Sequence, residues 1–172
     1  FQLLSRKRRG KGNGKEGEHH ANRDVDQQQE QEEEGEEIII HAHKLILKMN
    51  APELYLLCED ADEDTPIPIR GTSPEVFQIV LNYAYGGSFP KREPLKASNA
   101  EREPILKLGL EIIDAADRYG LIELKMLVET YLVAYRVMRK HNVADMLLFA
   151  DAKNCVLLKE YAFAYAISRS RD

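Results

Sequence analysis

The chain has 172 residues, of which 44% are hydrophobic and 31% are charged, and its formal net charge at pH 7 is -5. This is the length of one ordinary domain with tails, and the apolar content is sufficient for a buried core. The net negative charge argues against a protein that binds nucleic acid through bulk charge, because such proteins are strongly basic. No apolar run approaches the roughly 18 residues that a membrane-spanning helix requires. We therefore expect protein partners, with no membrane contact and no nucleic acid bound by the folded domain.

The two cysteines, Cys58 and Cys155, are too few for a disulfide framework. They predict reduced thiols in an intracellular protein that is cytoplasmic, nuclear or both. Cys58 lies on an apolar stretch and precedes two acidic residues, which would raise its pKa. Cys155 has Lys153 and Lys159 close in sequence, so it is the better candidate for a reactive thiol. Because the first residue is Phe1, we expect a fragment of a longer chain.

Residues 1–36 differ in composition from everything that follows them. A basic cluster at residues 6–9 is followed by glycines, glutamines and an acidic run. Almost nothing here can be buried, so ordering this segment would cost backbone entropy without an apolar return. We predict a disordered tail that acts as a solvated linker, with a nuclear-import signal at the basic cluster as the alternative.

Strand patterns are confined to the first third of the folded region. The β-branched run at residues 38–40 predicts one short strand, and the Ile-Pro-Ile run at residues 67–69 predicts another. Pro68 cannot donate a ladder hydrogen bond, so the second strand should lie at a sheet edge or be paired on one side only.

Helix patterns fill most of the remaining chain. Residues 43–49 predict a short buried helix, and Asn50 is a candidate cap for the helix that follows it. Ser73 and Pro74 predict a clear helix start, because a capping hydroxyl precedes a proline at the first helical position. The polar residues 88–104 contain three prolines and predict a long loop.

The last four helices each carry one apolar stripe, as expected when every helix packs against its neighbours. We place these stripes at residues 105–119, 121–135, 143–150 and 157–165. The predicted fold class is α+β, mostly α: a helical cluster at residues 37–137 with a small short-stranded sheet, followed by an extra helix pair at residues 138–172.

Four blocks of this chain, in the expected order and at roughly the expected spacing, resemble the BTB/POZ domain. They are residues 41–47 (HAHKLIL), residues 51–54 (APEL), residues 73–77 (SPEVF) followed by 81–87 (LNYAYGG), and residues 114–121 (DAADRYGL) followed by Leu124. Residues 142–160 more loosely resemble the helix pair that often follows this domain in adaptors of cullin ubiquitin ligases. The resemblance implies homodimerisation and, in one branch of the family, the bridging of a substrate to a cullin.

Two departures from the family pattern bear on these expectations. The first strand of the family usually begins with Asp-Val, whereas Asp24-Val25 is followed here by Asp26 and glutamines, so we expect a degraded strand and leave the oligomeric state open. Cullin-binding members tend to carry an apolar-x-acidic triplet, and here Leu108 occupies the nearest register with Glu111 one residue late. Cullin binding therefore also stays open.

The sequence contains no catalytic or metal-binding constellation, so we expect a non-enzymatic protein without a cofactor or a metal. His41 and His43 lack further ligands nearby, and the resemblance makes His43 a structural histidine that is hydrogen-bonded inside the fold. Asp114 and Asp117 are three residues apart on a predicted helix, and a solvated helix face explains them more simply than acid–base work.

We therefore expect a protein–protein interaction module that is a homodimerising scaffold or a substrate adaptor for a cullin-based ubiquitin ligase. A nuclear transcriptional or chromatin scaffold and a thiol-based redox sensor are the alternatives. The candidate partner-binding residues are Tyr85, Leu108, Glu111, Val143, Met146 and Leu147.

Overall fold

A computed structural model of the chain describes residues 2–7, 36–61, 65–89 and 98–169. These residues form three short strands and seven helices, which confirms the α+β, mostly α class. The strands are β1 (Gln2–Lys7), β2 (Glu36–His41) and β3 (Ile67–Ile69). The helices are α1 (Lys44–Asn50), α2 (Pro52–Leu56), α3 (Pro74–Ala84), α4 (Asn99–Arg118), α5 (Ile122–Ala134), α6 (Val143–Ala152) and α7 (Val156–Arg169).

The sheet corrects the expectation that all of residues 1–36 are disordered. Its strand order is β2-β1-β3, with β1 antiparallel to β2 and parallel to β3. Leu3 lies opposite Ile40 on one side and Ile67 on the other, and its side chain is fully buried. Backbone hydrogen bonds on both sides of β1 and the burial of one leucine therefore offset the entropy cost of ordering this segment, which composition alone does not reveal. The predicted disorder at residues 8–35, which include Asp24-Val25, lies outside the described residues.

The expectation for the Ile-Pro-Ile strand is confirmed. In the described sheet β3 pairs with β1 alone and therefore lies at an edge. Because an edge strand has a neighbour on one side only, the missing N–H of Pro68 does not interrupt hydrogen bonding to a second strand.

Helices α1 and α2 depart from the sequence expectations. Only Leu47 is buried in α1, whereas Leu45 and Met49 are 69% and 74% exposed, so the predicted buried helix is wrong. Asn50 does not cap α2, because it is the last residue of α1 and Ala51 occupies the N-cap position. Its side-chain amide instead donates a hydrogen bond at 2.7 Å to the carbonyl of Ala84, which ties α1 to the end of α3.

The predicted start of α3 is confirmed, because the Ser73 hydroxyl accepts a hydrogen bond from the Val76 N–H at 3.4 Å and Pro74 opens the helix. The predicted loop at residues 88–104 extends too far, since α4 begins at Asn99 and contains Pro104. The backbone N–H of Ser98 donates to the Glu101 carboxylate at 2.7 Å. This capping contact starts the helix five residues before the proline that suggested a loop. Residues 90–97 lie outside the described part of the chain.

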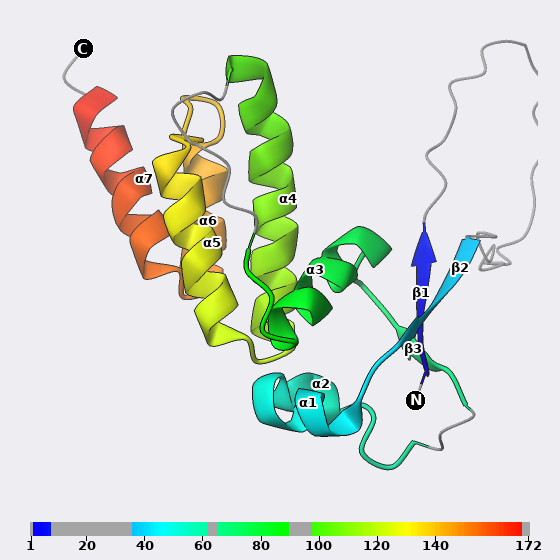
Figure 1. The fold of residues 1–172 in the computed structure, drawn as a ribbon. Coiled ribbons are helices and arrows are strands. Elements are labelled where there is room, and N and C mark those ends of the chain that lie inside the picture. Colours follow the sequence, from blue (N-terminus) through cyan, green and yellow to red (C-terminus); the bar gives the residue numbers. More distant parts are fainter. Residues whose placement is uncertain (1, 8–35, 62–64, 90–97, 170–172) are drawn as a thin grey trace, which may run out of the picture.

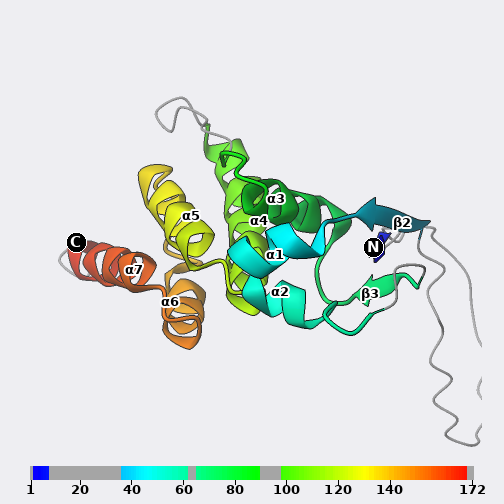
Figure 2. The same ribbon diagram turned by 60° about the horizontal axis from the view of Figure 1, so that its bottom comes forward.

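The bundle is arranged around α4 and α5. Figures 1 and 2 show the sheet and α7 at opposite ends of the molecule, with α3 and α4 between them. Helix α4 packs against α5, α6 packs against α7, and α7 packs against α5. The largest fully buried side chains include Phe77, Ile112, Tyr119, Leu132 and Leu158. The helix pair α6–α7 therefore shares one core with α5, while the expected domain division at residue 137 stays a prediction.

Candidate functional site

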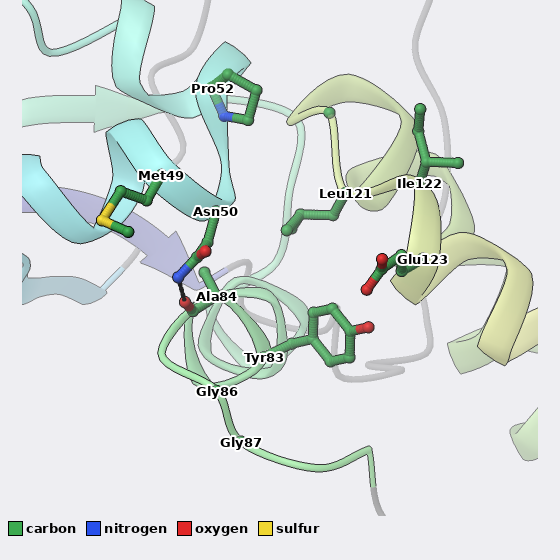
Figure 3. Close-up of a pocket in the computed structure, with 11 residues that line it drawn as sticks. Met49, Asn50, Pro52, Tyr83, Ala84, Gly86, Gly87, Leu121, Ile122 and Glu123 are labelled. Carbon is green, nitrogen blue, oxygen red and sulfur yellow. Dashed lines mark hydrogen bonds between the residues drawn. The ribbon is translucent and has the colours of Figure 1, made fainter.

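A pocket of about 550 Å³ opens where three junctions of the helical cluster meet. The junctions are the turn between α1 and α2, the end of α3, and the turn between α4 and α5. Figure 3 shows the lining residues arranged around this space, with Leu121, Tyr83 and Glu123 beside it and the Met49 and Ile122 side chains turned outward. The lining consists of Met49, Asn50, Pro52, Tyr83, Ala84, Gly86, Gly87, Gly120, Leu121, Ile122 and Glu123.

The turn between α4 and α5 approaches α2 closely because Gly120 has no side chain. Its φ is +76°, a left-handed conformation that favours glycine. A Cβ atom at this position would lie 2.9 Å from Cγ of Glu53. Gly120 therefore sets the distance between two of the three junctions that line the pocket.

The pocket joins an apolar rim to a polar wall. Met49 and Ile122 stand at the rim, 74% and 69% exposed. On the wall, the phenol of Tyr83 and the carboxylate of Glu123 face the same space (Figure 3). Burial raises the pKa of Tyr83, and the negative charge of Glu123 raises it further. The pocket can therefore bind a partner that presents an apolar side chain to the rim and a hydrogen-bond donor or a cation to the polar wall.

Tyr85, a predicted contact residue, is held by His43, the predicted structural histidine. The Tyr85 hydroxyl accepts a hydrogen bond from the His43 backbone N–H at 2.7 Å and lies 2.9 Å from Nδ1 of the ring. His43 is therefore hydrogen-bonded as expected, but its ring lies at the surface rather than inside the fold. The side chain of Tyr85 remains 40% exposed beside the pocket lining.

The structure places Leu108 and Glu111 on α4, where they differ in exposure. Leu108 is half-buried against the core, whereas Glu111 is exposed. Between them, Gly109 faces α5 so closely that a Cβ atom would lie 2.6 Å from Cδ2 of Leu132. Neither Leu108 nor Glu111 is among the residues that line the pocket.

The predicted contact helix α6 turns a different face outward from the one expected. Met146 is 2% exposed and belongs to the core, while Val143 and Leu147 are half-buried. Leu148, next to the predicted stripe, is 71% exposed. Sequence reasoning selected the residues of the apolar stripe, and these are the ones that pack inward. The apolar residue that projects to solvent, Leu148, does not belong to the predicted stripe.

Asp117 takes part in an ion-pair cluster that joins α4 to two other elements. Its carboxylate lies 2.6 Å from Nζ of Lys125 at the start of α5. Asp114 lies 2.8 Å from Nη2 of Arg118 and 2.5 Å from Nζ of Lys153, which follows α6. The two aspartates therefore tie helices together rather than only facing solvent, as the helix-face interpretation proposed.

Both thiols are buried. Cys58 donates a hydrogen bond from Sγ to the carbonyl of Leu54 at 2.9 Å. Burial is the main cause that raises its pKa, so the expected direction is confirmed but the expected acidic neighbours are not the cause. Burial, and then the negative charge of Glu129, raises the pKa of Cys155 to about 12. The expectation that Cys155 is the more reactive thiol is therefore wrong, because a thiolate is the reactive form.

In the described part of the chain, no helix has the length and apolar character required to cross a membrane. Within the same residues, no group of three or more histidine, cysteine, aspartate and glutamate side chains is placed to hold a metal ion.

Comparison with known proteins identifies the domain. Residues 33–136 match the BTB/POZ domain family. The chain belongs to the BTB/POZ family. The match begins shortly before β2 and ends shortly after α5, so it spans the pocket and the ion-pair residues on α4. Strand β1 and the helix pair α6–α7 lie outside the matched residues of this BTB/POZ chain.

Curated BTB/POZ relatives come from an animal and a plant. "TD and POZ domain-containing protein 1" of Mus musculus is 28% identical over 127 residues, which are 72% of this chain and 31% of the relative. "BTB/POZ and MATH domain-containing protein 5" of Arabidopsis thaliana is 31% identical over 105 residues, 57% of this chain and 25% of the relative. "BTB/POZ and MATH domain-containing protein 4" of the same plant is 28% identical over 130 residues, 73% of this chain and 28% of the relative. The chain therefore spans less than a third of the length of these relatives.

Membership in the BTB/POZ family makes this chain a protein–protein interaction module. The pocket and the exposed apolar residues of α1 suit this work, because both present apolar surface at the outside of the fold.

Proposed function

We propose that this BTB/POZ chain is a homodimerising module that serves as a substrate adaptor for a cullin-based ubiquitin ligase, in the cytoplasm, the nucleus or both. The observation that carries the dimer part of the proposal is the apolar face of α1 and α2. The adaptor part is supported by the pocket and by the helix pair that extends the fold beyond the matched domain.

The α1–α2 face exposes four large apolar side chains within a short stretch of chain. They are Leu45 at 69%, Met49 at 74%, Leu56 at 59% and Leu57 at 56% exposure. Burying a side chain of this size is worth about 1.5–3 kcal/mol relative to leaving it in water. Leu45 and Met49 are four residues apart on α1 and therefore share one face of that helix. Exposed apolar residues that gather on one face are typical of an interaction surface. A second copy of the chain can cover this face in a self-complementary way.

Light scattering on the purified chain tests the dimer. We expect a dimer mass for the wild type and a monomer mass for Leu45→Glu and for Met49→Glu, because a charge buried in an apolar contact is costly. Leu148→Glu is the matched control, since Leu148 is equally exposed but lies on α6. A wild type that is monomeric across the concentration range removes the dimer proposal.

A pull-down with the N-terminal region of a cullin tests the adaptor role. The variant Ile122→Glu places a carboxylate at the rim of the pocket, where the wild-type side chain is 69% exposed. We expect it to weaken capture more than Leu108→Ala combined with Glu111→Ala, because Leu108 is already half-buried by the protein's own core. The absence of capture by the folded wild type would remove the adaptor proposal.

A nuclear scaffold is the second candidate, supported by the basic cluster at residues 6–9. Backbone pairing places Arg6 opposite Glu37 and Lys7 opposite Glu36 at the end of β1. Half of the cluster therefore takes part in the sheet, which favours the adaptor over the nuclear scaffold. A fluorescent fusion that stays in the cytoplasm would count against the nuclear candidate.

A further inference from the structure

Strand β2 forms a sheet edge that lacks the protection found at the other edge. In the described sheet β2 pairs with β1 on one side and with no strand on its other side. The opposite edge, β3, has three residues and contains Pro68, and both features discourage the addition of another strand. Strand β2 has six residues with neither proline nor lysine. Alternate residues of β2 therefore offer backbone hydrogen-bonding groups on the side away from β1.

The isoleucines of β2 remain accessible on both faces of the sheet. Ile38 is 37% exposed and Ile39 is 51% exposed, while Ile40 is half-buried opposite Leu3. Because successive side chains of a strand alternate between faces, Ile39 lies on the face opposite that of Ile38 and Ile40. Figures 1 and 2 show β2 at the end of the molecule opposite α7. Exposed β-branched residues at an unprotected sheet edge favour pairing with a further strand.

We propose that β2 pairs antiparallel with β2 of a second copy of this chain, across a two-fold axis at Ile39. In this register Ile39 lies opposite Ile39 of the second copy, Ile38 opposite Ile40, and Glu37 opposite His41. Paired isoleucines stabilise a sheet through apolar contact, and a glutamate opposite a histidine brings an acceptor to a donor. The strand is therefore complementary to itself, as a two-fold interface requires.

The sequence of β2 favours this register over its neighbours. Residues directly opposite each other in an antiparallel pair direct their side chains to the same face, so the two-fold axis passes through a residue position. An axis at Ile38 would place Glu37 opposite Ile39, and an axis at Ile40 would place Ile39 opposite His41. Only the axis at Ile39 pairs each isoleucine with an isoleucine and the acid with the imidazole.

The joined sheet ends at protected edges. Pairing through β2 unites two three-stranded sheets and leaves β3 of each copy outermost. Because β3 is short and contains Pro68, the contact closes with two copies instead of continuing into a fibre.

This contact is separate from the α1–α2 face, because the two surfaces belong to different elements. The isoleucines of β2 are less exposed than the four apolar side chains of α1 and α2, so they bury less apolar surface. We therefore expect the β2 contact to form at higher protein concentrations than the α1–α2 dimer. A covalent bond between the two strands traps this weaker contact.

Disulfide cross-linking of Ile39→Cys tests the contact. The two thiols would lie directly opposite each other across the axis, where Cα atoms about 4.5–5.5 Å apart allow a disulfide. The native thiols of Cys58 and Cys155 are buried and do not compete. Leu148→Cys is the matched control, because Leu148 is exposed but lies on α6. With copper–phenanthroline as oxidant, we expect Ile39→Cys to form covalent dimers roughly tenfold faster than Leu148→Cys.

Both cysteine variants are also made in the Leu45→Glu chain. This change removes the α1–α2 contact, so the cross-linking rate then reports on β2 alone. We expect the advantage of Ile39→Cys to persist in this background, whether or not the wild type dimerises through α1 and α2. Equal rates for Ile39→Cys and Leu148→Cys in this background overturn the proposal.

Two substitutions of His41 test the register. The side chain of His41 is exposed, so both variants should fold. His41→Glu places two glutamates opposite each other and should slow the cross-linking of Ile39→Cys by roughly twofold to fivefold, whereas His41→Lys places a cation opposite Glu37 and should accelerate it. A general disturbance of β2 would not give opposite effects. Cross-linking that is no faster in His41→Lys than in His41→Glu overturns the proposed register.

Discussion

The carboxylate of Glu129 on α5 accepts a hydrogen bond from the backbone N–H of Leu158 in the first turn of α7 at 3.3 Å. Glu129 is 3% exposed, so this negative charge is buried beside the N-terminus of a helix, where unpaired N–H groups and the helix dipole stabilise it. The contact links the end of the matched BTB/POZ residues to the helix pair that follows them.

Replacing this carboxylate should loosen α7. We expect Glu129→Ala to reduce the free energy of unfolding by about 1–3 kcal/mol, because the N–H of Leu158 loses its buried partner. Glu129→Gln keeps an acceptor oxygen and should cost less. Hydrogen exchange at the first turn of α7, measured together with urea unfolding, reports the effect. Unchanged exchange in Glu129→Ala would show that the contact does not hold the helix.

The Cys155 thiol should be unreactive in the folded protein near neutral pH. Its pKa is raised to about 12 from the ordinary value of 9.0, so almost no thiolate forms at pH 7. We expect a disulfide reagent to modify this cysteine only after denaturation. Rapid modification of the native Cys58→Ala variant, in which Cys155 is the remaining thiol, would contradict the burial described above.

The same thiol should make stability depend on alkaline pH. A group whose folded pKa is raised holds its proton more firmly in the folded state, so its contribution is complete below the unfolded pKa of about 9 and decreases as pH rises towards about 12. This interval is covered by urea unfolding at pH values from about 8 to about 11. Over this range we expect Cys155→Val to lose less stability than the wild type. Identical slopes in the two proteins would refute this contribution.

The hydroxyl of Tyr85 should stabilise the junction of β2 and α1. Tyr85→Phe removes the hydrogen bonds to the backbone N–H and the ring of His43. Because both residues are partly exposed to water, we expect a loss of about 0.5–1.5 kcal/mol in the free energy of unfolding. Tyr55→Phe is the control, since the Tyr55 hydroxyl donates at 3.3 Å to the exposed carboxylate of Glu59, four residues further along the chain. An equal loss of unfolding free energy in the two variants would show that the hydrogen bonds to His43 make no special contribution.

Gly120 should be less tolerant of a side chain than Gly86. Both have positive φ, +76° and +81°, so alanine is strained at each by about 1–2 kcal/mol. At Gly120 the new Cβ would also lie 2.9 Å from Cγ of Glu53, whereas at Gly86 nothing lies within 4 Å. We expect Gly120→Ala to lower the thermal midpoint further than Gly86→Ala. A larger decrease of the thermal midpoint in Gly86→Ala would show that close packing of the α4–α5 turn against α2 does not limit residue 120.

Local chemistry made part of the fold predictable. A serine followed by proline starts α3 at Pro74, and a proline in Ile67–Ile69 confines β3 to a sheet edge. The apolar stripes identified α4 to α7 because helical spacing repeats within a few residues. One error was local, because the Ser98–Glu101 capping contact outweighs Pro104. The other came from distant groups, because Leu3 gains burial between two strands from other parts of the chain.

The candidate site was less predictable than the fold. The pocket joins three junctions that are far apart in sequence, and of the predicted contact residues only Tyr85 lies next to its lining. Apolar periodicity selects residues that face the core, so it pointed to Met146 and missed the exposed Leu148 and Ile122. The contribution of Glu129 to the environment of Cys155 could not be seen either, because the two residues are 26 positions apart in sequence.

The sequence by itself determined the helical character, the start of α3, the edge position of β3 and the resemblance to BTB/POZ domains. These properties depend on side chains and backbone groups within a few residues of one another. Only the tertiary structure decided which apolar residues stay exposed on α1 and α2, which lysines pair with the aspartates of α4, and that both thiols are buried. Burial and electrostatic environment are sums over neighbours from the whole chain, so they exist only after the helices have packed.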